Sequence, residues 1–233
     1  MLRTQTVAQG TLDLIKRFMS DNEFKNFNLV GGTALALKVG HRVSVDIDLF
    51  STTPFNTGDL GHHLAAVYSA TDIRTLGNSI FCFVNDVKID LLPHEYPLVE
   101  NIDILEGIRI VSLKDIGAMK LNAIFNSGQR LKDFVDMYSL LETFTLHELL
   151  DACHRKYPDL NINMVKHSLI HFNDIISSPI KFIGPEVKWP AISERLQKAF
   201  HNPYISFGLP ESTKKLIQNK SSEAKGKRKG PKL

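Results

Sequence analysis

The sequence contains little cysteine and no long apolar run. Its 233 residues include two cysteines, Cys82 and Cys153, which form neither a disulfide framework nor a metal-binding spacing. Because disulfides are rare in reducing compartments, we expect a cytoplasmic location. The first residues begin no apolar signal segment, and no run approaches the roughly 18 apolar residues of a membrane span. We therefore expect no membrane partner.

An excess of charge of one sign is also missing from most of the chain. The formal net charge is only +3, and the stretch from Lys220 to Lys232 contributes six basic side chains against one acidic one. The rest of the chain is therefore slightly acidic. We expect residues 213–233 to form a basic, disordered tail. Such a tail either binds RNA through phosphate contacts or keeps the protein soluble.

One stretch carries most of the chemical information, and it begins with Leu29-Val30-Gly31-Gly32-Thr33. Two adjacent glycines permit positive φ angles and let another molecule approach the backbone closely. The residues from Thr33 to Leu37 are predicted to form a short helix, which ends at Gly40. Free backbone N–H groups at the start of a helix suit a phosphate group, so we expect Gly31 and Gly32 to bind phosphate.

The same stretch continues into a predicted strand over residues 43–50, in which Ser44, Asp46 and Asp48 share one face. Two carboxylates so close together raise each other's pKa unless a cation lies between them. Mg²⁺ prefers hard oxygen ligands and accompanies phosphates. An Asp-x-Asp pair also occurs on solvated strand faces, but the Gly-Gly turn before it favours a metal and phosphate site.

These residues resemble a known group of enzymes. Gly31-Gly32-Thr33 followed by Asp46-Ile47-Asp48 is similar to the first motif of the nucleotidyltransferase superfamily related to DNA polymerase β. The fuller string GGTALAL…GHRVSVDIDLF closely resembles the AbiEii/AbiGii family of toxins in type IV toxin–antitoxin and abortive-infection systems. The resemblance implies an NTP substrate, a separate antitoxin encoded alongside, and in some relatives a tRNA acceptor.

The resemblance also implies a third carboxylate on a strand beside the Asp-x-Asp strand. Asp90, within Lys88-Ile89-Asp90-Leu91-Leu92, has the right place in the order of elements. Three carboxylates can hold two Mg²⁺ ions, which stabilise the attacking and leaving oxygens of phosphoryl transfer. We therefore expect Asp46, Asp48 and Asp90 to bind metal, with Asp90 also activating the acceptor hydroxyl. The alternative is an ordinary charge on an edge strand.

Further candidates lie on two predicted helices. Lys120 falls within an apolar stripe, so it either extends to solvent or is held by buried anions. The string Lys132-Asp133-Phe134-Val135-Asp136 resembles the later motifs of the family. By that resemblance, Lys120 and Lys132 face triphosphate oxygens, and Asp136 orients a lysine or assists catalysis. The other interpretation of Lys132 and Asp136 is an exposed i,i+4 ion pair.

Hydrophobic periodicity predicts an α/β (α+β) fold with a small mixed sheet, flanking helices and a helical C-terminal lobe. We divide the chain into a nucleotidyltransferase core at 1–111, a helical lobe at 112–212 and the tail at 213–233. The predicted helices span about 8–20, 33–37, 60–67, 113–126, 131–142, 145–153, 163–176 and 192–200. The predicted strands span 27–30, 43–50, 73–76, 80–84, 87–92 and 102–111.

The sequence therefore favours a Mg²⁺-dependent nucleotidyltransferase that moves an NMP from an NTP to an acceptor, with RNA as the expected acceptor. Thr33, Ser44 and Arg42 are further candidates to line the phosphates. The other interpretation of Arg42 is an ordinary arginine on the surface of a turn. Two alternatives remain open: a small-molecule nucleotidyltransferase of the antibiotic-modifying type and a non-catalytic NTP-binding module. An Asp-x-Asp glycosyltransferase is a weaker competitor.

Overall fold

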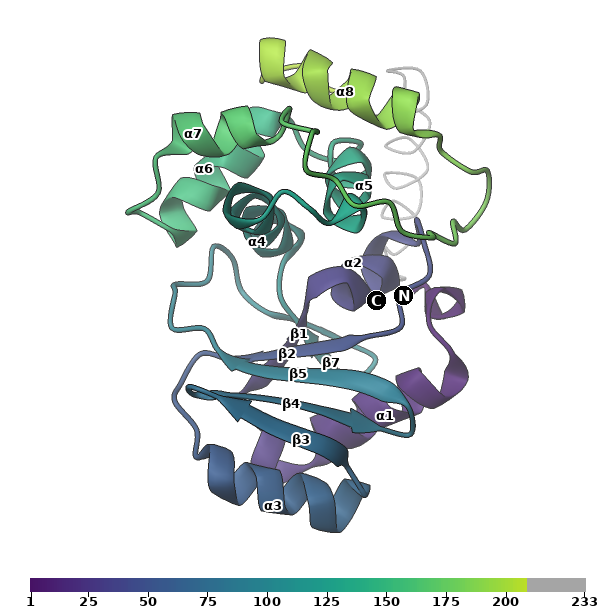
Figure 1. Ribbon diagram of the computed structural model, residues 1–233, viewed down its shortest axis with the longest axis vertical. Coiled ribbons are helices and arrows are strands. Elements are labelled where there is room, and N and C mark those ends of the chain that lie inside the picture. Colours follow the sequence, from purple (N-terminus) through teal and green to yellow (C-terminus); the bar gives the residue numbers. More distant parts are fainter. Residues whose placement is uncertain (209–233) are drawn as a thin grey trace, which may run out of the picture.

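The computed structural model describes residues 1–208, so the predicted tail at 213–233 and the end of the predicted lobe lie outside the described residues. The α/β class is confirmed: a mixed sheet lies between two groups of helices (Figure 1). None of the helices in residues 1–208 has the length and apolar composition of a membrane span.

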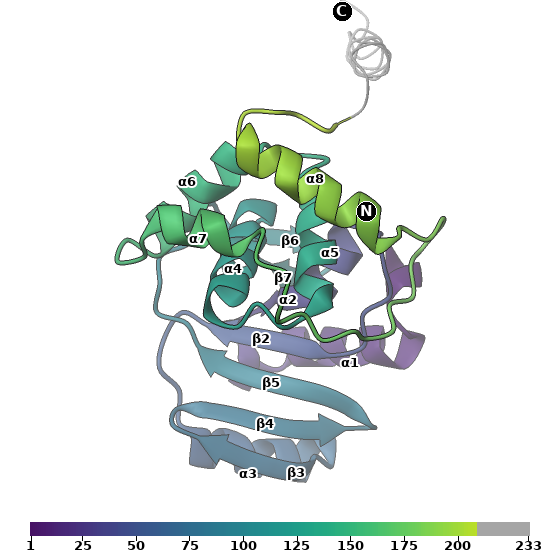
Figure 2. The same ribbon diagram turned by 45° about the horizontal axis from the view of Figure 1, so that its top comes forward.

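The sheet has seven strands in the order β3-β4-β5-β2-β1-β7-β6. Figure 2 shows β2, β5, β4 and β3 side by side in this order. Two neighbouring pairs are parallel, β2 with β5 and β1 with β7, and the other pairs are antiparallel. The strands are β1 (Phe27–Val30), β2 (Ile47–Ser51), β3 (Thr71–Leu76), β4 (Ser79–Val84), β5 (Val87–Pro93), β6 (Asp103–Leu105) and β7 (Ile108–Ile110).

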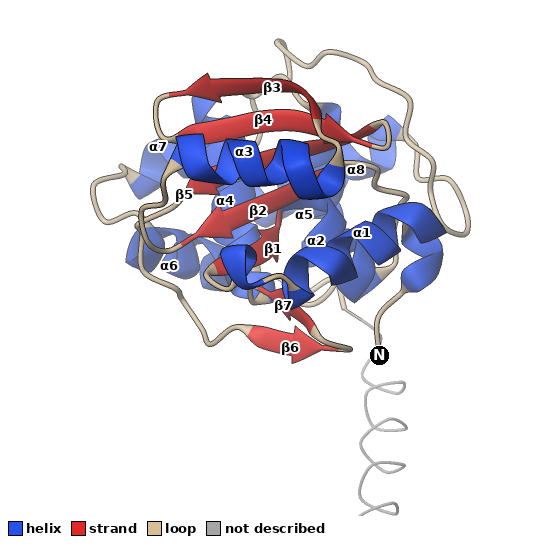
Figure 3. Cartoon of the chain, turned by 90° about the horizontal axis from the view of Figure 1, so that it is seen from below, coloured by secondary structure: helices blue, strands red, loops and turns tan. Residues whose placement is uncertain are grey.

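Helices cover both faces of this sheet. Figure 3 shows α1 (Gln9–Ser20) and α3 (Thr57–Tyr68) across one face. On the other face lie α2 (Gly31–Val39) and α4 (Leu113–Asn126) (Figure 1). Side chains alternate along β2, where Ile47 and Leu49 are fully buried while Asp48 and Phe50 are only partly covered. The polar side of β2 thus faces the same side of the sheet as α2 and α4.

The remaining helices stack above α4, as Figures 1 and 2 show. Helix α4 packs against α5, α6 and α7. Thr145 and Glu148 form a capping box at the start of α6, because each side chain accepts the other's backbone N–H. These helices are α5 (Leu131–Leu140), α6 (Leu146–Lys156), α7 (Ile162–Ser168) and α8 (Trp189–His201).

Three predicted elements were wrong in extent. The strand expected at 43–50 begins only at Ile47, because residues 41–44 pair elsewhere: Val43 N–H donates to Lys181 O at 2.8 Å, and Ser44 N–H donates to Thr6 O at 2.9 Å. The strand expected at 102–111 is a hairpin, β6–β7, which turns at Glu106 and Gly107 with positive φ angles. The helix expected at 163–176 ends at Ser168.

Candidate active site

The glycine turn lies where β1 passes into α2. Gly31 has φ of 71°, and a Cβ atom placed there would lie 2.1 Å from Oδ2 of Asp48. A side chain at Gly32 would lie 2.6 Å from the guanidinium of Arg42. Among residues 1–208, no side chain caps the N terminus of α2, so its first N–H groups remain available to an anion beside Asp48.

Two of the predicted carboxylates are direct neighbours on parallel strands. Asp48 of β2 pairs in register with Asp90 of β5. Burial, followed by the charge of Asp90, raises the pKa of Asp48 to about 6, and the charge of Asp46 acts in the same direction. Carboxylates that repel each other in this way form a site to which a cation binds favourably.

The partners of Asp90 differ between its two oxygens. Its Oδ2 lies 2.5 Å from Nζ of Lys88, whose side chain is 45% exposed. Its Oδ1 is buried and has no hydrogen-bond partner among residues 1–208. A buried carboxylate oxygen left unpaired costs free energy, so this atom is free to accept a metal ion or a proton.

These residues fit a divalent cation by their chemistry. Asp46, Asp48 and Asp90 offer hard oxygen donors, one of them an unpartnered buried atom, and phosphate-binding N–H groups lie beside them. Within the described part of the chain, however, no three His, Cys, Asp or Glu side chains are grouped closely enough to form a metal site as they stand.

A second cluster of charges is centred on Asp136 of α5, which is fully buried. Arg42 donates to both of its oxygens, at 2.7 and 2.9 Å, and Nζ of Lys120 lies 2.6 Å from Oδ2. His41 Nε2 lies 2.8 Å from Oδ1. Although burial alone would raise the pKa of Asp136, Lys120 and Arg42 hold it well below its usual range. Asp136 therefore fixes two cations beneath the glycine turn.

Lys120 is buried and does not extend to solvent. Its ammonium group lies between two carboxylates, 2.6 Å from Asp133 Oδ1 and 2.6 Å from Asp136 Oδ2. Burial would lower the pKa of Lys120, but the charges of Asp136 and Asp133 raise it. The lysine is thus a fixed positive charge, held by two residues of the predicted Lys-Asp-x-x-Asp string.

Some of the predicted site residues line one pocket, whereas Asp46 and Asp90 do not line it. Gly31, Gly32, Asp48, Lys120 and Asp133 line a single pocket of about 140 Å³ between the start of α2, the middle of β2 and the helices α4 and α5. The pocket is therefore built from residues that are distant in sequence.

Thr33 and Ser44 lie beneath this pocket. The buried Thr33 hydroxyl donates to the backbone oxygen of Asp46 and lies 2.9 Å from Ser44 Oγ. Together with the Arg42–Asp136 pair, these contacts fix the backbone on both sides of the turn. Thr33, Ser44 and Arg42 thus support the pocket from below and do not line it.

Lys132 is the predicted residue that the fold keeps apart from the others. It lines a separate surface pocket with Gln129, Arg130, Ile176 and Ser178, and not the pocket that contains Asp48. No ion pair joins it to Asp136 among residues 1–208, because Asp136 faces Lys120 and Arg42. The i,i+4 ion pair considered from the sequence is therefore wrong.

Two residues of the site were missed from the sequence. Arg130 lines the pocket, and its charge lowers the pKa of Asp48. Arg130 could have been predicted from its position two residues before Lys132, which was already a candidate. His41 contacts Asp136 across 95 residues of sequence, and its Nδ1 is buried without a partner in the described part of the chain. Nothing local in the sequence predicts that contact.

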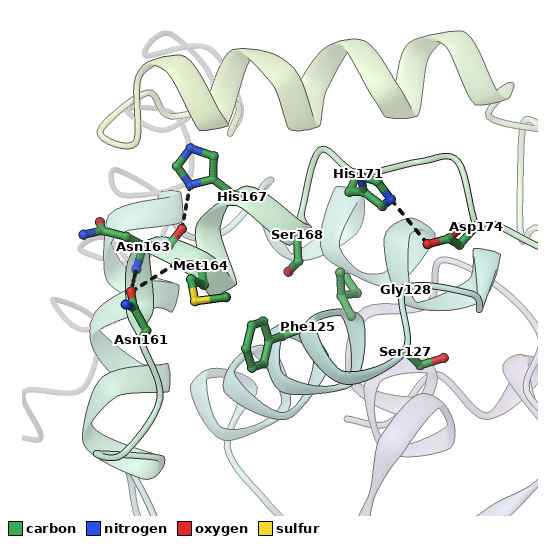
Figure 4. Close-up of a pocket in the computed structure, with 11 residues that line it drawn as sticks. Phe125, Ser127, Gly128, Asn161, Asn163, Met164, His167, Ser168, His171 and Asp174 are labelled. Atoms are coloured by element: carbon green, nitrogen blue, oxygen red, sulfur yellow. Dashed lines mark hydrogen bonds and ion pairs between the residues drawn. The ribbon is translucent and has the colours of Figure 1, made fainter.

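A larger cavity, of about 530 Å³, lies elsewhere, between the end of α4 and α7 (Figure 4). It holds none of the predicted metal or phosphate residues. His167 Nδ1 lies 2.7 Å from Asn163 O, and His171 pairs with Asp174 at 3.3 Å (Figure 4). The two histidines do not share a helix face, because α7 ends before His171.

Comparison with known proteins gives relatives in several groups. A curated protein, "Uncharacterized protein aq_aa25" of Aquifex aeolicus (strain VF5), is 28% identical over 188 residues, which cover 78% of this chain and 90% of that protein. The Megavirus polyadenylate synthase is 19% identical with a TM-score of 0.41, over 55% of this chain and 30% of that one. This chain thus spans less than a third of that enzyme. The antibiotic-resistance factor ANT(2'')-Ia is 13% identical with a TM-score of 0.49, over 63% of this chain and 91% of that one.

A family model matches the segment that carries the glycine turn and the Asp-x-Asp pair. The family is described as "Nucleotidyl transferase AbiEii toxin, Type IV TA system", and the match covers residues 13–80. Asp90, Lys120 and Asp136 lie beyond the matched segment, whereas Gly31, Gly32 and the Asp-x-Asp pair lie within it. The predicted resemblance of this chain to the AbiEii nucleotidyltransferase toxin family is therefore confirmed, in residues 13–80.

Proposed function

We propose that this protein transfers a nucleoside monophosphate from an NTP to a hydroxyl group of an RNA acceptor, with release of pyrophosphate. One observation carries the proposal: the uncapped start of α2 lies beside Asp48, which pairs with Asp90. A phosphate binder adjacent to paired carboxylates is the arrangement that Mg²⁺-assisted phosphoryl transfer requires.

The residues divide the chemistry between them. Asp46, Asp48 and Asp90 would hold Mg²⁺, which neutralises phosphate charge when bound. The N–H groups at Gly31 and Gly32 bind phosphate oxygens, while the buried Oδ1 of Asp90 accepts the proton of the acceptor hydroxyl.

Positive charge in the pocket has two sources. Lys120 is held between Asp133 and Asp136, and its fixed charge stabilises the negative charge that develops on the leaving pyrophosphate. Arg130 lines the same pocket with a mostly exposed side chain, so it can move to meet the substrate. Lys132, in the first turn of α5, lines the neighbouring surface pocket that Arg130 also borders, and it contacts a longer substrate there.

The description of the matched family supports a biological role as the toxin of a type IV toxin–antitoxin pair. In that role the partner is an antitoxin encoded by a neighbouring gene. Induced expression in a bacterial host tests this role. Growth arrest by the wild type, and normal growth with Asp48→Asn at equal protein level, would support it; equal growth with both proteins would contradict it.

A labelling assay tests the reaction. Purified protein, MgCl₂ and each α-³²P NTP are incubated with total bacterial RNA, in parallel with Asp48→Asn, Asp90→Asn and the control Asp151→Asn. Asp151 lies on α6 with a side chain that is 56% exposed, so its loss leaves the pocket intact. Label in a discrete RNA band that the first two variants lose and the control keeps would establish the transfer.

Two other outcomes would contradict the RNA proposal. Label that enters a small molecule, and never RNA, would identify a small-molecule transferase. NTP binding without pyrophosphate release under every acceptor tried would identify a non-catalytic binding module.

A further inference from the structure

Four aromatic side chains form a row near the candidate active site: Phe50, His94, Tyr96 and Tyr157. The ring centroids lie 4.9 Å apart for Phe50 and His94, 5.0 Å for His94 and Tyr96, and 4.8 Å for Tyr96 and Tyr157. Such separations are those of aromatic pairs in contact. We refer to these four residues as the aromatic row.

The aromatic row begins inside the candidate active site. Phe50 follows Asp48 by two residues on the same face of β2, which corresponds to about 7 Å along the strand. Phe50 lines the pocket together with Asp48 and Gly31. His94 directly follows β5, the strand of Asp90, and its N–H donates to Ser51 O at 2.7 Å. The two strands that carry the carboxylates thus also carry the first two rings.

One ring of the row, Tyr96, is exposed to solvent, whereas the row ends in the core at Tyr157. Tyr157 is buried, with 4% of its surface exposed, and is explained as part of the core, whereas Tyr96 is 49% exposed. The Tyr157 hydroxyl lies 3.3 Å from His94 Nε2. Burial and the nearby Lys156 lower the pKa of His94 to about 4, so the imidazole is uncharged at neutral pH. The row is therefore an uncharged aromatic surface next to a highly charged pocket.

The segment that carries Tyr96 is fixed at its other end. Figure 1 shows the chain rising from the end of β5 toward α4. The buried Lys156 donates to Pro97 O at 3.1 Å and pairs with Asp115 at 2.9 Å. Asp115 also accepts the N–H groups of Val99 and Glu100. Because these contacts already hold the segment in place, little free energy is lost in ordering it when a ligand stacks on Tyr96.

We infer that the aromatic row is a subsite on which an unpaired nucleobase stacks while phosphates occupy the adjacent pocket. A surface of this kind suits nucleobases because every base has a flat apolar face, and stacking on an aromatic side chain tolerates any sequence. The base belongs either to the NTP or to the end of the RNA acceptor. The inference takes its ligand class, a nucleotide or RNA, from the proposed function. It adds the place where the base of that ligand binds.

Binding of a fluorescent base tests the inference directly. Two probes are titrated in MgCl₂: 2-aminopurine riboside triphosphate, and a short single-stranded RNA with 2-aminopurine at its 3′ end, whose fluorescence falls on stacking. The variants are Phe50→Leu, Tyr96→Leu and Tyr96→Phe, and the control is Tyr204→Leu, because Tyr204 is a 69% exposed tyrosine outside the row. Thermal unfolding confirms that each variant is folded.

Because stacking on an aromatic ring contributes to the affinity for each base, Phe50→Leu and Tyr96→Leu are expected to weaken binding of at least one probe by roughly fivefold or more. Tyr96→Phe and Tyr204→Leu are expected to bind as the wild type does. The probe that is affected identifies the source of the base. Unchanged affinity for both probes in folded Phe50→Leu and Tyr96→Leu would overturn the inference. Because the readout is binding, a protein that shows these losses but transfers no nucleotide would overturn the proposed function alone.

Discussion

Asp48 and Asp90 lie opposite each other on the parallel strands β2 and β5, and the charge of Asp90 raises the cost of keeping Asp48 charged. Burial and the charge of Asp90 raise the pKa of Asp48 to about 6 in the folded protein. The usual value in an unfolded chain is about 3.9. Between these values the folded state binds more protons than the unfolded state, so this group makes the protein less stable as the pH rises.

Removing that charge should therefore stabilise the metal-free protein. We expect Asp48→Asn to raise the free energy of unfolding by about 1–3 kcal/mol at pH 7.5, and the gain to vanish near pH 4. Urea unfolding at pH 4, 6 and 7.5 without metal measures it. Mg²⁺ should stabilise the wild type and not the variant, since metal binding requires the carboxylate. A variant less stable than the wild type at pH 7.5 would contradict this account.

Asp136 has the opposite electrostatic environment, because cations surround it. We expect Asp136→Asn to lower the free energy of unfolding by about 3–5 kcal/mol at neutral pH, since the buried charges of Lys120 and Arg42 lose their shared partner. The folded-state pKa of Asp136 is lowered, so its contribution is present above about pH 4 and is lost as the pH falls further.

The matched control for Asp136 is an exposed ion pair. Asp151 pairs with Arg155 at 3.1 Å, and both side chains are at least half exposed. Asp151→Asn should cost less than about 1 kcal/mol at any pH. Denaturant unfolding of the two variants between pH 3 and 7.5 measures both effects. A cost for Asp136→Asn that matches the control would show that the buried cluster is not coupled to stability.

The fold could be predicted well where the hydrophobic pattern is local, and the site only in part. The strands at 27–30, 80–84 and 87–92 and the helix at 113–126 have regular patterns, and the structure matches them closely. Arg42 and Asp136, by contrast, are 94 residues apart and meet only through the tertiary fold. The strand expected from Val43 fails for the same reason, since residues near 181 pair with its backbone. Long-range pairing of this kind leaves no local periodicity.

The glycine turn gives a prediction with a matched control inside the same chain. Gly31→Ala introduces a Cβ 2.1 Å from Asp48 Oδ2 and places alanine at φ of 71°. We expect a loss of stability of at least about 1–2 kcal/mol from the backbone conformation, together with loss of NTP binding. At Gly10 on α1, no atom of the described residues lies within 4 Å of the Cβ position, so Gly10→Ala should stabilise the protein by about 0.5–1 kcal/mol.

Thermal unfolding and NTP titration distinguish the two glycine variants. The expected pattern is a lower melting temperature and weaker NTP binding for Gly31→Ala, and a slightly higher melting temperature with unchanged binding for Gly10→Ala. If Gly31→Ala binds NTP as tightly as the wild type does, the backbone at this turn does not approach the phosphates.

The buried pair of Lys156 and Asp115 connects α6, α4 and the segment that carries Tyr96. Both side chains have no exposed surface. We expect Lys156→Met to lower the free energy of unfolding by about 3–5 kcal/mol at pH 7.5, because Asp115 remains as a buried charge without its cation. The pKa of Asp115 should then rise, since burial is opposed only by its hydrogen bonds to Ser112, Val99 and Glu100.

A double variant distinguishes charge from packing at this pair. Asp115→Leu combined with Lys156→Met removes both charges, and apolar replacements of buried ion pairs are often neutral or stabilising. Here we expect only partial recovery, because the N–H groups of Val99 and Glu100, whose hydrogen bonds to Asp115 are partly buried, lose their acceptor. Urea unfolding compares the single and double variants with the exposed control Lys198→Met. Full recovery by the double variant would mean that Asp115 does not anchor this segment.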